Sequence, residues 1–123
     1  MAMKRILVVD DSPIVLEACK IALEEAGFSV LCVQTPSFSL QDAMERPDLA
    51  LIDVMLPGAM AGDDLARFMK QVSAEIPVLL FSDLDEAELR ERAAAAGAQG
   101  YICKDWGMEE LVRRVKAILT DQG

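Results

Sequence analysis

The stretch "RILVVDDSPIVL", residues 5–16, combines the signals of a strand and of a helix. Residues 5–10 are almost continuously apolar, which is typical of a strand covered on both faces of a parallel sheet. Ser12 is a good N-cap and Pro13 suits the first helical position, so a helix is predicted to begin here. Asp10 and Asp11 therefore lie where a buried strand ends, and two negative charges there require an explanation.

The same alternation of apolar runs and helix-period segments continues along the chain. The predicted strands cover residues 5–10, 28–35, 48–54, 76–83 and 100–104. The predicted helices run from Ser12 to Gly27, around residues 38–45, along a stripe of Leu65, Phe68, Met69 and Val72, through the Ala-rich segment that ends at Gly97, and over residues 108–119. Such alternation predicts right-handed βαβ units, and hence an α/β doubly wound parallel sheet with helices on both faces.

Length and charge restrict the class of protein. A chain of 123 residues fits one domain with its own core. The net charge of −9 makes direct binding to a nucleic acid backbone unfavourable, so proteins and metal ions are the expected partners. The absence of histidine excludes His-based triads and phosphohistidine chemistry within the chain.

Cysteines and apolar runs indicate the compartment. Cys19, Cys32 and Cys103 are an odd number and match no metal or redox spacing, so all three are predicted to be small buried hydrophobic residues. No apolar run approaches the roughly 20 residues of a membrane-spanning helix, and no secretory signal is visible. We expect a soluble, cytoplasmic protein without membrane contact.

Chemically active side chains collect at the predicted carboxyl ends of the strands. These side chains are Asp10, Asp11, Asp53, Ser82 and Lys104. In open parallel sheets this edge is where ligands bind. Three close carboxylates need a compensating cation, and all-oxygen ligation suits Mg²⁺. An aspartate beside a divalent cation and a lysine is equipped to attack phosphorus and form an acyl phosphate, although each aspartate alone also fits a simple helix cap.

Four motifs now identify a family resemblance. They are "VVDDS" (8–12), "LIDVMLP" (51–57), "LLFSD" (79–83) and "GYICKD" (100–105). With them the chain resembles, over essentially its full length, the receiver domain of bacterial two-component response regulators. The resemblance implies a flavodoxin-like (βα)5 fold with a five-stranded parallel sheet of order 2-1-3-4-5. It also implies one receiver domain over residues 1–123 without an output domain, either standing alone or as part of a longer regulator.

The resemblance also implies roles for individual residues. The implied phosphoacceptor is Asp53, and the implied Mg²⁺ ligands are Asp10, Asp11, Asp53 and the backbone carbonyl of Met55. The residues implied to contact the phosphoryl group are Ser82 and Lys104. The implied switch residue is Tyr101, an aromatic residue that turns inward when Ser82 moves. Phosphorylation would add nearly two negative charges at Asp53 and bias a two-state surface.

The implied function is switching rather than enzymatic turnover of a substrate. The phosphoryl group would come from a histidine kinase or a phosphotransfer protein, and the switched surface would bind a downstream protein target or a second copy in a phosphorylation-dependent dimer. Catalysis would be limited to self-phosphorylation and self-dephosphorylation. The alternative is a phosphorylation-independent pseudo-receiver, a protein-interaction module that uses the acids only structurally.

Three features depart from the family pattern. The usual lysine-proline step is Lys104-Asp105 here, and a cis peptide before a non-proline residue costs about 2.5 to 4 kcal/mol, so its isomer is left open. The segment from Pro57 to Gly62 is one residue longer than usual, which would alter kinase docking. Met55 places an apolar side chain near the attacking water, which predicts slow self-dephosphorylation.

Overall fold

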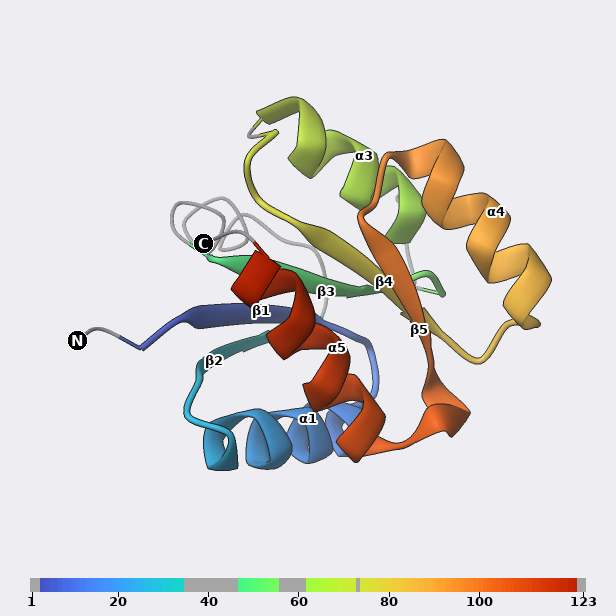
Figure 1. Cartoon of the computed structure of the whole chain (residues 1–123). Coiled ribbons are helices and arrows are strands. Elements are labelled where there is room, and N and C mark those ends of the chain that lie inside the picture. The colour runs from blue at the N-terminus through green and yellow to red at the C-terminus, as the bar shows by residue number, and fades with distance from the viewer. Residues whose placement is uncertain (1–2, 35–46, 56–61, 73, 122–123) are drawn as a thin grey trace.

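The structure is a computed structural model that describes residues 3–34, 47–55, 62–72 and 74–121 (Figure 1). Five parallel strands form one sheet in the order β2-β1-β3-β4-β5. Helices α1 and α5 cover one face of this sheet, and α3 and α4 cover the other (Figure 1). The predicted doubly wound α/β fold and its strand order are therefore confirmed.

The strands are short and differ in burial according to their place in the sheet. Their bounds are β1 Arg5–Val9, β2 Ser29–Val33, β3 Leu49–Asp53, β4 Val78–Ser82 and β5 Gly100–Cys103. All residues of β3 and β4 are buried, whereas those of the edge strand β2 are half-buried. Central strands covered on both faces need apolar residues at every position, which explains their unbroken runs.

The helices begin and end at the expected signals. Their bounds are α1 Pro13–Glu25, α3 Gly62–Val72, α4 Glu86–Ala96 and α5 Met108–Asp121, with a 3₁₀ turn, η1, at Lys104–Trp106. The Ser12 hydroxyl accepts a hydrogen bond from Val15 N at 3.3 Å and caps α1. Gly97, with φ of 76°, ends α4 in the left-handed conformation that favours glycine. The helix predicted around residues 38–45 lies outside the described residues.

Alternation along the strands divides the core into two layers. The α1/α5 layer contains Ile6, Val8, Leu49, Leu51, Leu79, Phe81 and Ile102 from the sheet. The α3/α4 layer contains Leu7, Val9, Ala50, Ile52, Val78 and Leu80. Successive side chains point to opposite faces, so each strand contributes to both layers.

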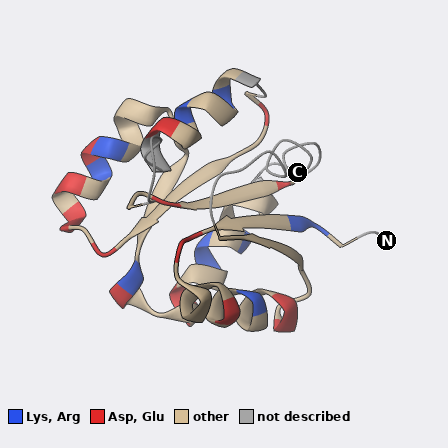
Figure 2. Ribbon diagram, turned by 180° about the vertical axis from the view of Figure 1, so that it is seen from behind, with Lys and Arg blue, Asp and Glu red and all other residues tan. Residues whose placement is uncertain are grey.

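Two details of the predicted core are corrected. Phe68 is 44 % exposed, because α3 is anchored by Leu65, Ala66 and Met69 instead. Cys19 and Cys103 are buried as predicted, but Cys32 is only half-buried because it lies on the edge strand β2. Figure 2 shows that charged residues lie mainly on the helices and loops, with the middle of the sheet nearly free of charge. None of the helices in the described ranges is long and apolar enough to span a bilayer.

Candidate functional site

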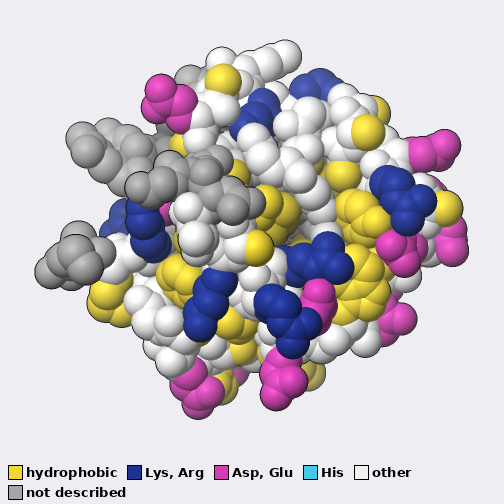
Figure 3. Space-filling model, in the orientation of Figure 1, with side chains coloured by type: hydrophobic (Ala, Val, Ile, Leu, Met, Phe, Trp, Pro, Cys, Tyr) yellow, Lys and Arg dark blue, Asp and Glu magenta, His cyan; other side chains and the backbone are white. Residues whose placement is uncertain are grey.

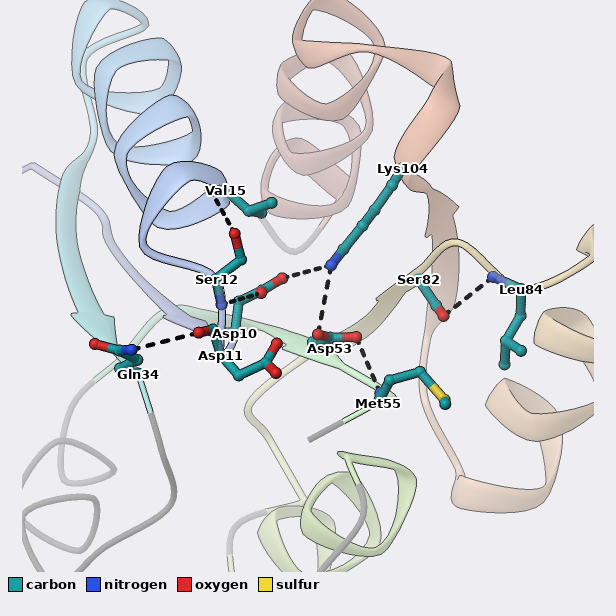
Figure 4. Close-up of polar contacts among 10 residues, drawn as sticks. All are labelled: Asp10, Asp11, Ser12, Val15, Gln34, Asp53, Met55, Ser82, Leu84 and Lys104. Carbon is teal, nitrogen blue, oxygen red and sulfur yellow. Dashed lines mark hydrogen bonds and ion pairs between the residues drawn. The ribbon is translucent and has the colours of Figure 1, made fainter. Parts of the chain in front are cut away.

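The sheet brings four charged side chains together at its carboxyl edge. Asp53 is the last residue of β3, Asp10 follows β1 directly, and Lys104 follows β5. Strand alternation places all three on the α1/α5 side, in continuation of Val8, Leu51 and Ile102. Asp11 lies beside them, and Figure 4 shows the carboxylates of Asp10 and Asp53 and the ammonium directed toward one another.

Three carboxylates form a compact cluster. Asp10, Asp11 and Asp53 each offer an oxygen within 4.8 Å of the others. Asp10 is completely buried and Asp53 is 2 % exposed, whereas Asp11 is exposed. Like charges this close, two of them out of water, repel one another strongly unless a cation lies between them.

Backbone amides already hold one oxygen of each buried carboxylate. Asp10 Oδ1 accepts a hydrogen bond from Ser12 N at 2.9 Å, and Asp53 Oδ1 accepts one from Met55 N at 3.0 Å. These bonds leave Asp10 Oδ2 and Asp53 Oδ2 facing the space between the strands (Figure 4). Local turns thus orient both carboxylates before any cation binds.

Lys104 supplies the resident positive charge. Its Nζ lies 2.8 Å from Asp10 Oδ2 and 3.4 Å from Asp53 Oδ2, and its side chain is 15 % exposed. Burial lowers the pKa of this ammonium, but the two carboxylates outweigh that effect and raise the pKa above its ordinary value. Lys104 is therefore charged throughout the physiological range.

The pKa of Asp53, the predicted phosphoacceptor, is shifted from its ordinary value. Burial raises the pKa of Asp53, and the nearby Asp10 adds to the rise. The hydrogen bond from Met55 N and the charge of Lys104 act in the opposite direction but do not cancel it. A carboxylate that is costly to ionise gains from any additional cation at the site.

The donor set suits Mg²⁺. Asp10 Oδ2 is buried and receives no backbone hydrogen bond; its partner is the Lys104 ammonium 2.8 Å away. Carboxylate oxygens at a hydrated edge match the preference of Mg²⁺ for oxygen ligands with several retained waters. Asp10, Asp11 and Asp53 could hold the ion. The ligand role of the Met55 carbonyl stays a prediction, since the structure places only its amide on Asp53.

Ser82 lies at the end of β4 but has a different partner. It is completely buried, and its hydroxyl accepts a hydrogen bond from Leu84 N at 3.2 Å. Figure 4 shows the hydroxyl directed toward Leu84. A contact between Ser82 and a phosphoryl group on Asp53 would require the hydroxyl to turn toward Asp53, where its hydrogen could be donated.

Tyr101 is held on the outside of the sheet. Its hydroxyl donates to Glu86 Oε2 at 2.8 Å and accepts from Arg90 Nε at 3.1 Å, and Arg90 also pairs with Glu86 at 3.2 Å. The ring lies 5.8 Å from that of Trp106, which in turn is 4.6 Å from the guanidinium of Arg114. Figure 3 shows basic side chains beside hydrophobic ones on this face. Inward rotation of Tyr101 would break both hydrogen bonds.

Of the noted departures, the structure places the Lys104-Asp105 step but not the segment from Pro57 to Gly62. The structure contains no cis peptide bond among its described residues, so the Lys104-Asp105 peptide is trans. The segment from Pro57 to Gly62 lies outside the described residues except for Gly62, which begins α3. The effect of its extra residue stays a prediction.

Phe81 is a further neighbour of the site, outside the set predicted from the sequence. Phe81 is buried, and the Lys104 ammonium lies 5.3 Å from the centroid of its ring. Phe81 pairs in register with Asp53 on β3 and with Ile102 on β5. Because side chains alternate along β4, Phe81 lies on the same face of the sheet as Asp53.

Comparison with known proteins assigns the family. The model of the response regulator receiver domain matches residues 6–116, and this chain belongs to that family. It is 36 % identical over 123 residues to the phosphate regulon transcriptional regulatory protein PhoB of Pseudomonas aeruginosa, covering 98 % of this chain and 53 % of that protein. It is 34 % identical over 119 residues to the probable transcriptional regulatory protein TcrX of Mycobacterium tuberculosis, covering 96 % and 50 %.

A solved structure agrees with the assignment. A CheY-like response regulator receiver domain protein from Methanospirillum hungatei matches with a TM-score of 0.88 and 29 % identity. The match covers 98 % of this chain and 97 % of that one. By contrast, the chain spans about half the length of the curated relatives it matches.

Proposed function

We propose that this chain is a phosphorylation-controlled switch in which Asp53 accepts a phosphoryl group from a histidine kinase or a phosphotransfer protein, with Mg²⁺ bound beside it. One observation carries the proposal. A nearly buried carboxylate, Asp53, shares the carboxyl edge of the sheet with the oxygens of Asp10 and Asp11 and with the Lys104 ammonium 3.4 Å away. A merely structural aspartate would not need this constellation.

The chemistry assigned to Asp53 is a substitution at phosphorus. Asp53 Oδ2 is the attacking oxygen in this scheme, because Oδ1 accepts the hydrogen bond from Met55 N. The new bond joins that oxygen to phosphorus, while the bond from phosphorus to the donor's leaving group breaks and the leaving group keeps the electron pair. Positive charge beside the transferred group is the main source of acceleration in such reactions.

Lys104 and a metal ion held by the carboxylates would both stabilise the negative charge of the transferred group. The Lys104 ammonium, already 3.4 Å from Asp53 Oδ2, would pair as a point charge with the phosphoryl oxygens that arrive there. Mg²⁺, when bound by Asp10, Asp11 and Asp53, would neutralise charge on the phosphoryl oxygens. Ser82, whose hydroxyl accepts a hydrogen bond from Leu84 N, would turn toward Asp53 and donate its hydroxyl hydrogen to the phosphoryl group.

The expected output is a change of protein partner. Movement of Ser82 and inward rotation of Tyr101 would release Glu86 and Arg90 and change the surface formed by α4, β5 and α5. A downstream protein, or a second copy of the chain, would read that surface. PhoB and TcrX are named as transcriptional regulators, so we propose a transcriptional output for this switch. The net charge of −9 argues against DNA binding by this domain itself.

The first test is intact-protein mass spectrometry after incubation with acetyl phosphate and Mg²⁺. We expect one phosphoryl adduct that requires Mg²⁺ and disappears in Asp53→Asn. Asp83→Asn is the matched control, because Asp83 is an exposed aspartate one residue beyond β4 and should leave the adduct intact. A folded protein that forms no adduct with acetyl phosphate or with a histidine kinase would instead support the pseudo-receiver.

A further inference from the structure

We infer that Phe81 is a positioning residue for Lys104, and that its ring holds the ammonium where it can serve both Asp10 and Asp53. The inference depends on the proposed function, because it assigns Phe81 a part in phosphoryl transfer to Asp53. It concerns a side chain that offers no polar atom.

The strand order separates Lys104 from its two carboxylate partners. Lys104 follows β5, whereas its two partners lie at the ends of β3 and β1, so its side chain has to pass over the end of β4. The residue of β4 at this level is Phe81, which pairs in register with Asp53 on one side and with Ile102 on the other. Phe81 belongs to the α1/α5 layer, on the side of the sheet where the ammonium lies.

The ring offers the ammonium an electrostatic partner. Phe81 is 1 % exposed, and Lys104 Nζ lies 5.3 Å from the ring centroid. The face of an aromatic ring carries partial negative charge and attracts a cation at this distance, more strongly where water is excluded. The ammonium therefore has three neighbours with negative potential, namely the carboxylates of Asp10 and Asp53 and the face of Phe81.

A neutral partner is useful because the charged ones are needed elsewhere. Phosphorylation would change the charge at Asp53, and a bound metal ion would compete with the lysine for the oxygens of Asp10 and Asp53, so neither carboxylate can fix the lysine throughout the reaction. The ring is unaltered by these steps. A lysine side chain has a flexible stem of four carbons, so its ammonium is easily displaced. Small displacements of a catalytic group slow the reaction considerably.

Fluorinated phenylalanines test this role without removing the ring. Incorporation of 4-fluoro-, 3,5-difluoro- and 3,4,5-trifluorophenylalanine at position 81 withdraws charge from the ring face stepwise and keeps its shape. We expect the rate of phosphorylation by acetyl phosphate at saturating Mg²⁺ to fall stepwise, by about tenfold at the trifluoro ring. The free energy of unfolding of Lys104→Met carrying the same rings reports any change in packing.

Two controls separate electrostatics from packing. Phe28 is a buried phenylalanine in the same hydrophobic layer, and the same rings placed at position 28 should leave the rate unchanged. In Lys104→Met, where no ammonium remains, fluorination at position 81 should also have no effect. A rate that ignores fluorination at position 81, or that falls equally at position 28, overturns the inference.

A second readout does not require phosphorylation. In the native protein the ring current of Phe81 should shift the ε-methylene protons of Lys104 upfield in the proton NMR spectrum, and Phe81→Leu should abolish that shift. Ordinary shifts in the native protein would overturn the positioning role. A native chain that shows the upfield shift but forms no phosphoryl adduct would refute the proposed function and leave the placement of Lys104 by Phe81 supported.

Discussion

The Lys104 ammonium lies 2.8 Å from Asp10 Oδ2 and 3.4 Å from Asp53 Oδ2, so its nearer partner is Asp10 rather than the proposed phosphoacceptor. Asp10 is completely buried, and its paired oxygen receives no hydrogen bond from the backbone. The lysine therefore supplies compensating positive charge to this buried carboxylate. Several consequences of this arrangement can be measured.

Lys104→Met should destabilise the metal-free protein by about 3 kcal/mol, because removing one partner of a buried ion pair leaves uncompensated charge. Urea unfolding at neutral pH measures the loss. Since the pKa of Lys104 is raised above 10.5, the stabilisation should be fully present below pH 10.5 and vanish as the pH rises through the raised value. Lys116→Met, at an exposed lysine of α5, is the control, and an equal loss in both variants would contradict the prediction.

Asp53→Asn should stabilise the metal-free protein at neutral pH. Folding raises the pKa of Asp53, mainly through burial, so ionisation opposes the folded state. The native protein should lose stability relative to Asp53→Asn as the pH rises from the ordinary aspartate pKa of about 4 through the raised value, and the difference should then stay constant. Chemical unfolding across this pH range measures the difference in stability, with Asp83→Asn as control. A difference that does not depend on pH would contradict the prediction.

Mg²⁺ should stabilise the folded protein by about 1.4 kcal/mol when its concentration is ten times its dissociation constant. Thermal unfolding with and without a chelator measures the effect. Asp11→Asn should weaken it, because this carboxylate belongs to the acidic cluster. Asp105→Asn alters an exposed acid near the site and should leave the response unchanged, so an equal weakening in both variants would point to nonspecific screening.

Trp106 should report the switch. It is the single tryptophan of the chain, and its ring lies 5.8 Å from that of Tyr101. Addition of beryllium fluoride, which mimics a phosphoryl group, together with Mg²⁺ should change its fluorescence if Tyr101 turns inward. The change should be absent in Asp53→Asn and smaller in Tyr101→Ala. An identical response in Tyr101→Ala would separate Trp106 from the rotation of Tyr101.

Met55 should slow hydrolysis of the phosphorylated protein. Its side chain is 60 % exposed and lies two residues beyond Asp53, where an apolar group cannot orient the attacking water. Met55→Asn should shorten the half-life of the phosphoryl adduct, whereas Met55→Leu should preserve it. Mass spectrometry over time distinguishes the two, and an unchanged or longer half-life in Met55→Asn would contradict the prediction.

Local sequence signals were sufficient for the architecture. The apolar run of residues 5–10, the Ser12-Pro13 start of α1 and the Gly97 stop of α4 each act within a few residues of the chain, and each holds in the structure. Two fully buried strands follow from their unbroken apolar runs, since only a sheet covered on both faces accommodates them. The strand order, by contrast, came from the family resemblance and not from periodicity.

The carboxyl-edge rule also anticipated which polar residues would gather, because parallel strands end at one side of the sheet. The pairing among them could not be foreseen. The Lys104 side chain passes β4 to reach Asp10. Ser82 accepts a hydrogen bond from Leu84 N, and Tyr101 bonds Glu86 and Arg90. Each contact depends on a side-chain rotamer that packing in the folded protein selects. The sequence by itself determined the alternation of strands and helices and the polar residues at the strand ends. Only the tertiary structure decided their partners and the place of Phe81 beneath the ammonium, because those depend on which strands lie side by side.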